Sequence, residues 1–245
     1  MRFVQKDLIY GKDMIKEKIM RLNKKILKNI KKKNINLITI DGVTCSGKSL
    51  FAKLLKKKLE NKSLDILILS KDLFLFTRGQ RINVNQKIKK PNKNQNPLHY
   101  NLPKLNIVLK FLFGKTNKKS LILKKLYNRK TGGNDFTLKL SYSKNRLIIF
   151  EGIYINEDIN FIKKPILKIL MIEKVYKSLS RKIQRIRDKK ISIQLVVTEF
   201  VKLHLVSYSD YLLRNNFDIS FEDKDRVFTE VKGGKNKQKK YISNF

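Results

Sequence analysis

Ten residues in the first fifth of the chain, DGVTCSGKSL (41–50), restrict the fold more than any other stretch. Two of them are glycines, Gly42 and Gly47, and a lysine and a serine follow the second glycine. The apolar run INLITI (35–40) comes directly before them, and helical spacing predicts an amphipathic helix after them, over 49–60. A glycine-framed turn between a buried strand and a helix is typical of an α/β protein with a parallel sheet.

The spacing in this stretch matches G-x-x-x-x-G-K-[ST], with Gly42, Gly47, Lys48 and Ser49 at the four fixed positions. The backbone N–H groups of such a loop wrap around phosphate oxygens, and the N-terminus of the following helix adds positive potential. We expect Lys48 to reach the β- and γ-phosphates and the Ser49 hydroxyl to bind Mg²⁺. The sequence therefore predicts an ATP-binding P-loop. Its residues are Gly42, Val43, Thr44, Cys45, Ser46, Gly47, Lys48, Ser49 and Leu50.

Strands and helices alternate along most of the 245 residues. Apolar runs predict further strands at 64–70, 146–150, 166–172 and 217–221, and helical spacing predicts helices over 103–113, 174–188 and 192–213. The alternation favours a P-loop NTPase fold with a central parallel sheet flanked by helices.

Three ranges describe the expected domain organisation. The main domain is expected over 35–222, after a basic helical extension over 1–34 and before a basic, flexible tail over 223–245. The stretch between the second and third central strands is too long for a simple loop. We therefore expect an inserted lobe over 76–142, which would hold the phosphate acceptor, and a small helical lid.

The formal net charge is +37 at pH 7, with 57 lysines and arginines against 20 aspartates and glutamates. Lysine supplies 46 of the basic residues and arginine 11, and the lysines are spread over the whole chain. This pattern indicates a solvated basic surface rather than a groove built for nucleic acid. We expect nucleic acid to bind only nonspecifically, with an affinity that falls as salt rises.

The cellular compartment is predicted from two features. No apolar run approaches the length of a membrane span, which is about 20 residues, and the single cysteine excludes an intrachain disulfide. The sequence therefore predicts a cytoplasmic protein. We interpret Cys45 as a small loop residue rather than a nucleophile, and the sequence leaves a homo-oligomer open.

Two acidic residues stand at predicted strand ends, in a chain that has few acids. Asp72 follows the strand of ILSKD, and Glu151 ends the strand of IIFEG. Ligands of an open parallel sheet bind beyond the carboxyl ends of its strands, so both side chains should meet the P-loop in one crevice. An acid there can take a proton from an acceptor hydroxyl or hold Mg²⁺.

The predicted helix of VYKSLSRKIQRIRD (175–188) carries scarce arginines. Lys177, Arg181 and Arg185 recur at i, i+4 and i+8 and therefore share one face. The planar fork of arginine suits phosphate better than the lysine ammonium does. We expect this helix to close over ATP with Arg181 and Arg185.

The order of these motifs resembles the uridine kinase and phosphoribulokinase family of P-loop kinases. The similar segments are the P-loop, LSKDLF, a proline-containing acceptor segment, LYNRKTGG, IIFEGIYI, the arginine-rich helix and a final Y…FDI, which span 35–221. The resemblance implies an enzyme that uses ATP and Mg²⁺ to phosphorylate a hydroxyl of a small sugar-like substrate. The leading acceptor is the ribose 5′-hydroxyl of uridine or cytidine.

Several roles follow from this resemblance. It makes Asp72 the catalytic base, in contact with the substrate, and gives Ser49 and Glu151 the handling of Mg²⁺. It places Tyr127 against a nucleoside, and it makes the arginine-rich helix a lid from which Arg185 also reaches the substrate.

The acceptor segments depart from the family pattern. Uridine kinases usually have Asp-His-Pro where this chain has Gln95, Asn96 and Pro97, and YNRKTGG lacks the usual acid and histidine. Two alternatives therefore stay open: a related kinase acting on a ribulose phosphate or a pantothenate-like or glycerate-like acceptor, and a degenerate, RNA-associated nucleotide-binding module. We interpret His99 and His204 as surface or helix residues, and Tyr127 could equally be a core aromatic of the hairpin.

Overall fold

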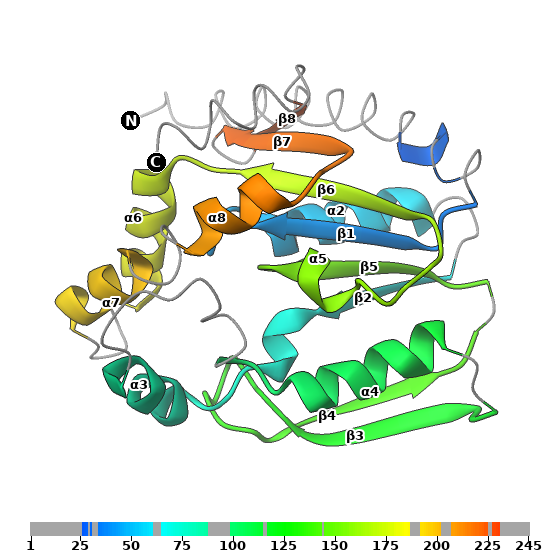
Figure 1. Cartoon of the computed structure of the whole chain (residues 1–245), viewed down its shortest axis with the longest axis horizontal. Coiled ribbons are helices and arrows are strands. Elements are labelled where there is room, and N and C mark those ends of the chain that lie inside the picture. Colours follow the sequence, from blue (N-terminus) through cyan, green and yellow to red (C-terminus); the bar gives the residue numbers. More distant parts are fainter. Residues whose placement is uncertain are drawn as a thin grey trace, which may run out of the picture.

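The centre of the molecule is a six-stranded sheet in the order β2–β5–β1–β6–β7–β8 (Figure 1). Its strands are β1 (Leu37–Gly42), β2 (Ile66–Ser70), β5 (Leu147–Gly152), β6 (Ile166–Ile172), β7 (Ile219–Lys224) and β8 (Val227–Glu230). Neighbouring strands from β2 to β7 in this order pair in parallel, and β8 pairs antiparallel with β7. The predicted P-loop NTPase fold with a central parallel sheet is confirmed.

The computed structural model describes residues 26–28, 30, 34–60, 65–87, 99–114, 117–143, 145–186, 192–201, 207–224 and 227–230. Most of the predicted N-terminal extension lies outside these ranges. Ile26, near its end, is fully buried in the domain core. Among the described residues, no helix combines the length and apolar character that crossing a membrane requires.

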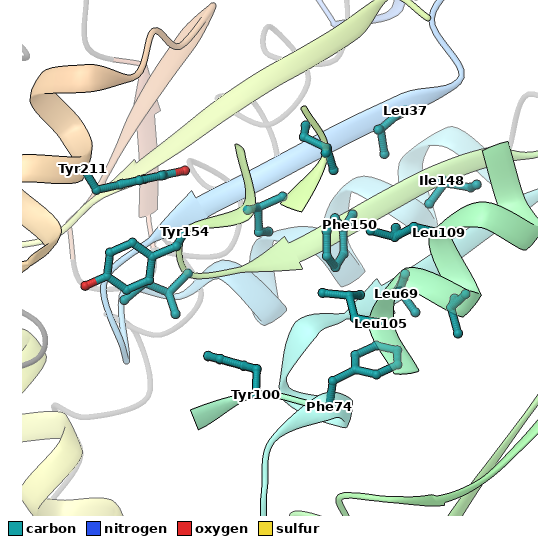
Figure 2. Packing of buried hydrophobic residues seen from close by; sticks show 14 of the residues in the cluster. Leu37, Leu69, Phe74, Tyr100, Leu105, Leu109, Ile148, Phe150, Tyr154 and Tyr211 are labelled. Atoms are coloured by element: carbon teal, nitrogen blue, oxygen red, sulfur yellow. The ribbon is translucent and has the colours of Figure 1, made fainter. Parts of the chain in front are cut away.

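Helices cover both faces of the sheet, which is why all six residues of β1 and of β5 are buried. On one face lies α2 (Lys48–Glu60), whose buried Phe51, Leu55 and Leu59 join one apolar cluster. On the other face lie α4 (Leu102–Phe113), α5 (Ile155–Asp158) and α8 (Ser207–Arg214). A second apolar cluster lies on this other face, and Figure 2 shows some of its side chains. It includes Leu105 and Leu109 of α4, Phe150 of β5 and Tyr211 of α8.

Between β2 and β5 the chain forms η1 (Lys71–Phe74), α3 (Arg78–Lys87), α4, β3 (Ser120–Leu126) and β4 (Phe136–Ser141). All of these except η1 lie within 76–142, the range predicted as an inserted lobe. Strands β3 and β4 form a separate antiparallel pair. Helix α4 packs its buried leucines into the same cluster as the central strands, so this region shares the core of the domain.

Two predicted elements differ from the structure. The helix predicted over 192–213 is two helices, α7 (Ile193–Glu199) and α8, which lie in different places (Figure 1). Helical spacing could not show this, because α8 is fixed by long-range contacts of its tyrosines. The boundary predicted at residue 222 is also too early, since β8 extends the sheet to Glu230.

The carboxyl ends of the parallel strands face α3, α7 and α6 (Val175–Ile186) (Figure 1). Helix α6 buries its apolar side chains, Leu179 and Ile183 among them, only in part. Its one fully buried residue is Ser178, whose hydroxyl donates a hydrogen bond to the Thr44 carbonyl of the P-loop. The helix therefore packs on the loop through a polar contact.

A buried ion pair fixes the start of η1 beneath the strand ends. Lys71 is fully buried, and its Nζ lies 2.7 Å from Asp158 Oδ2, donates to the Ile153 carbonyl at 3.0 Å and lies 4.6 Å from the centre of the Tyr100 ring. Burial raises the pKa of Asp158 to about 6, and the charge of Lys71 opposes that rise. The pair ties η1, which carries Asp72, to the segment after β5.

Replacing Lys71 by methionine is expected to lower the free energy of unfolding by about 3–5 kcal/mol, because the Asp158 carboxylate loses its buried partner. A carboxyl with a raised folded-state pKa stabilises least when it is ionised, so the loss should grow as pH rises from 4 to 8. Urea unfolding at both pH values measures it. The double variant Lys71→Met/Asp158→Leu should recover most of the loss, and a double variant as unstable as the single one would contradict this account.

Candidate functional site

The P-loop leaves β1 and enters α2, as the sequence predicts. Lys48 is folded back over the loop, where its Nζ donates hydrogen bonds to the carbonyls of Gly42 at 2.8 Å and Val43 at 2.6 Å. The contact closes the loop into a ring with the ammonium group on its inner side. A phosphate placed there would meet both that charge and the N-terminus of α2.

Two of the loop's glycines are required by its backbone path. A Cβ on Gly42 would lie 2.6 Å from Ser46 Oγ and 2.7 Å from the Met171 carbonyl, too close for any side chain. Gly47 has a φ of 88°, in the left-handed region that glycine adopts without strain. The backbone of Cys45 is also left-handed, with a φ of 62°.

A cavity of about 480 Å³ lies at the carboxyl ends of the strands, and it brings the predicted residues together. Lys48 and Ser49 of the loop, Asp72 of η1 and Glu151 of β5 all line it. Further lining residues are Thr44, Cys45, Ser46, Gly47, Leu50, Leu75, Ile82, Ile153, Ile186, Leu195 and Val196. The segments that carry these groups are far apart in sequence. They meet because ligands of an open parallel sheet bind beyond the carboxyl ends of its strands.

The charges in the cavity act on one another. Burial lowers the pKa of the Lys48 ammonium, and the negative charges of Glu151 and Asp72 oppose this shift. Burial raises the pKa of the Glu151 carboxyl, the charge of Asp72 raises it further, and hydrogen bonds from Ser70 and Ser49 lower it. A bound cation would favour the ionised form of Glu151.

Ser49 and Glu151 fit the ligand preferences of Mg²⁺. The Ser49 hydroxyl donates a 3.1 Å hydrogen bond to Glu151 Oε2, so two oxygen ligands already stand side by side at the mouth of the P-loop. Within the described ranges, no group of three or more histidine, cysteine, aspartate or glutamate side chains could hold a metal ion. Mg²⁺ is typically held by one or two protein oxygens together with substrate phosphates, and this donor set suits that arrangement.

The arginines predicted to bind ATP are placed differently from each other. Arg185 lines the cavity. Arg181 instead forms an ion pair with the buried Glu173, and its Nη1 lies 3.5 Å from the Cys45 carbonyl. Arg181 therefore braces α6 against the P-loop, while the next residue, Lys182, lines the cavity.

Tyr127 is a buried aromatic of the hairpin that also lines the cavity. It is 6% exposed, and its backbone N–H donates to the Leu73 carbonyl at 2.9 Å, so it fixes the hairpin to η1. It also lines the cavity, where Arg81 Nη2 lies 3.2 Å from its hydroxyl. His99, interpreted from the sequence as a surface or helix residue, lines the cavity too, whereas His204 lies outside the described residues.

Asp41, the residue before the P-loop, is a buried acid that the sequence analysis missed. Its Oδ1 accepts hydrogen bonds from the N–H groups of Gly42 at 2.7 Å and Tyr154 at 3.2 Å, and its Oδ2 accepts one from the Ile155 N–H at 2.9 Å. Burial raises the pKa of this carboxyl, and its hydrogen bonds lower it. Asp41 thus joins the start of the P-loop to the turn after β5.

Two tyrosines of α8 complete the surroundings of Asp41. The Tyr208 hydroxyl donates to Oδ1 at 3.0 Å, and the Tyr211 hydroxyl donates to Oδ2. Both rings are buried and stack on each other with centroids 5.4 Å apart. An acid at the end of an apolar strand was the only sequence signal for this contact, because its partners come from distant segments.

Replacing Asp41 by alanine is expected to lower the free energy of unfolding by about 3–5 kcal/mol, because the buried hydroxyl and N–H donors lose a charged acceptor. Urea unfolding followed by circular dichroism measures the change. Asp65→Ala is the matched control, since that carboxylate is 48% exposed and pairs with Arg146. Its loss should stay below about 1 kcal/mol. Equal losses in the two variants would contradict the role given to Asp41.

Three further arginines, which the sequence pattern did not single out, line the cavity. Arg78 and Arg81 come from α3, and Arg129 comes from the turn between β3 and β4. Arg129 forms an ion pair with Asp72. The segment YNRKTGG contains Arg129, but only the folded hairpin shows that it reaches an acid 57 residues away.

Comparison with known proteins identifies the fold. The sequence model of the family described as "Chromatin associated protein KTI12" matches residues 35–109, a range that includes the P-loop and Asp72. None of the curated proteins matches the chain.

Solved structures resemble the chain over most of its length at low identity. A possible uridine kinase from Bacillus stearothermophilus is 16% identical with a TM-score of 0.59, covering 84% of this chain and 98% of that one. D-glycerate 3-kinase from Cryptococcus neoformans var. grubii is 13% identical with a TM-score of 0.57, covering 88% and 97%. Phosphoribulokinase from Rhodobacter spheroides is 11% identical with a TM-score of 0.51, covering 78% and 70%. The chain has the fold of the P-loop kinases.

Proposed function

We propose that the protein is an ATP-dependent kinase that transfers the γ-phosphate to a hydroxyl of a small, sugar-like substrate. The observation that carries this proposal is that Lys48, Ser49, Asp72 and Glu151 line the same cavity. The fold supports it, because each similar structure described above is named as a kinase.

In the proposed reaction, the Asp72 carboxylate takes the proton of the acceptor hydroxyl. The hydroxyl oxygen forms a bond to the γ-phosphorus, and the bond between that phosphorus and the β,γ-bridging oxygen breaks to release ADP. Lys48 stabilises the charge on the transferred group, and Ser49 and Glu151 are the residues that would hold Mg²⁺. When bound, the metal ion neutralises phosphate charge and orients the nucleotide.

Acceptor-dependent release of ADP from Mg·ATP tests the proposal. The resemblance to uridine kinases makes uridine and cytidine the first acceptors to supply, followed by other hydroxylated metabolites. A phosphorylated product is expected, and Lys48→Ala or Asp72→Ala should abolish it. If both variants keep the wild-type turnover, the roles assigned to the two residues are wrong.

A nucleotide-binding module without phosphoryl transfer is the second candidate. The match of residues 35–109 to the KTI12 family and the altered acceptor segment favour it. It predicts that Mg·ATP binds, that no acceptor stimulates ADP release, and that RNA binds with an affinity that falls steeply as salt rises. RNA binding that vanishes near physiological salt, together with acceptor-dependent ADP release, would decide for the kinase.

A further inference from the structure

The cavity holds two groups of positively charged side chains, and only one adjoins the P-loop. Lys182 and Arg185 come from α6, which packs on that loop. Arg78, Arg81 and Arg129 stand at the end that contains the proposed base. A bound triphosphate accounts for the first group, whereas in the second group only Arg129 has a carboxylate partner, Asp72, among the described residues. We propose that the acceptor itself carries a carboxylate or phosphate group, which these three arginines bind. This inference rests on the proposed function.

Polar contacts fix two of these arginines, one of them against the proposed base. Arg129 forms an ion pair with Asp72. Arg81 is held by its Nε, which donates to the Phe76 carbonyl at 3.0 Å, and by its Nη2, which lies 3.2 Å from the Tyr127 hydroxyl. Its guanidinium carbon lies 5.2 Å from the centre of the Tyr127 ring. These contacts leave part of the guanidinium of Arg81 to meet a ligand.

Of these three arginines, Arg78 has the most N–H groups available to bind a ligand. It precedes Arg81 by three positions on α3, so the two side chains share a face of the helix. Within the part of the chain that the structure describes, Arg78 has no hydrogen-bond or ion-pair partner, although it is half-buried at the cavity. A partly desolvated guanidinium without a counter-charge favours an anionic ligand.

The general excess of lysine does not explain these residues. The chain has 46 lysines and 11 arginines, yet the described lining from α3 and the hairpin contains three arginines and no lysine. The only acids among the described lining residues are Asp72 and Glu151. Two acids do not balance the basic groups at both ends of the cavity. A neutral nucleoside would leave that imbalance in place, whereas an anionic acceptor removes it.

The ion pair of Arg129 with Asp72 gives the anion a second consequence. An acceptor that carries a negative group offers Arg129 a new partner, and the Asp72 carboxylate is then released toward the acceptor hydroxyl. Arg129 therefore links acceptor binding to the availability of the base. An uncharged acceptor has no group that can draw Arg129 away.

Binding of anions to the nucleotide complex tests the inference without turnover. Calorimetry would follow glycerate and inorganic phosphate binding to the wild-type protein saturated with Mg²⁺ and the non-hydrolysable analogue AMP-PNP, which fills the P-loop. We expect at least one anion to bind, with an affinity about 10-fold or more lower in Arg78→Gln. Arg146→Gln, which changes an arginine outside the cavity, should bind like the wild type. Equal affinities in the wild type and Arg78→Gln, or no binding of either anion, would overturn the inference.

Turnover with matched acceptors separates this inference from the proposed function. The pairs are glycerate with glycerol and ribose 5-phosphate with ribose, and uridine is added as a neutral nucleoside. We expect a charged member to exceed its neutral partner by about 100-fold in kcat/KM, and Arg129→Gln to raise the KM of that acceptor while leaving the KM of ATP unchanged. Turnover of glycerate would indicate that the acceptor carries a carboxylate, and turnover of ribose 5-phosphate would indicate that it carries a phosphate.

Two other results would separate the anionic acceptor from the kinase activity. Efficient turnover of uridine or of a neutral partner, with no gain from charge, would overturn the anionic acceptor and leave the kinase standing. Anion binding that depends on Arg78, without ADP release for any acceptor, would support the anion site and count against the kinase.

Discussion

Replacing Lys48 by methionine is expected to lower kcat/KM for acceptor-dependent ADP release by about 10³-fold, which corresponds to about 4 kcal/mol of transition-state stabilisation. The reason is the position of its ammonium group, which closes the P-loop through the carbonyls of Gly42 and Val43 and lines the cavity. Methionine keeps the length of the side chain and removes its charge. A coupled assay of ADP release measures the effect.

Lys53→Met is the matched control for this prediction. Lys53 lies on the same helix, α2, but is exposed and does not line the cavity. Its variant should keep wild-type kinetics, and circular dichroism should show that both variants are folded. Wild-type kcat/KM in Lys48→Met would contradict the role of the P-loop in transfer.

Replacing Asp72 by asparagine is expected to lower kcat by about 10²–10⁴-fold, because the amide cannot accept the proton of the acceptor hydroxyl. The KM of ATP should change little, since Asp72 stands on η1 rather than in the P-loop. Steady-state kinetics with each substrate varied separates the two effects. The pattern sets Asp72 apart from Lys48, whose loss should affect the nucleotide as well.

Asp65→Asn controls for the loss of one negative charge in a strongly basic protein. Asp65 precedes β2, whereas Asp72 follows it, so the two acids stand at opposite ends of one strand. The control should leave kcat unchanged. A kcat for Asp72→Asn equal to that of Asp65→Asn would show that Asp72 is not the base.

The parts of the site that the sequence could predict are those that local rules determine. The P-loop depends on a fixed spacing of residues between one strand and one helix, and both elements are present as β1 and α2. Asp72 and Glu151 follow from the rule that parallel strands end at the same edge of a sheet. Their meeting with Lys48 in one cavity needed only the correct assignment of three strands.

The residues that the sequence analysis missed depend on contacts between distant segments. Asp41 binds tyrosine hydroxyls that lie 167 and 170 positions further along the chain. Arg129 reaches Asp72 only because the β3–β4 hairpin folds back over η1. In a chain with 57 basic residues, composition gives no sign of which few line a cavity. Periodicity likewise could not separate α7 from α8.

A structure of the protein with Mg²⁺ and AMP-PNP tests the central claim most directly, namely that the P-loop, Asp72 and Glu151 act on one terminal phosphate. We expect the terminal phosphate between Lys48 and the Asp72 end of the cavity, with the metal ion bound to Ser49 and close to Glu151. An analogue bound elsewhere, or a terminal phosphate separated from Asp72 by packed protein, would contradict the account.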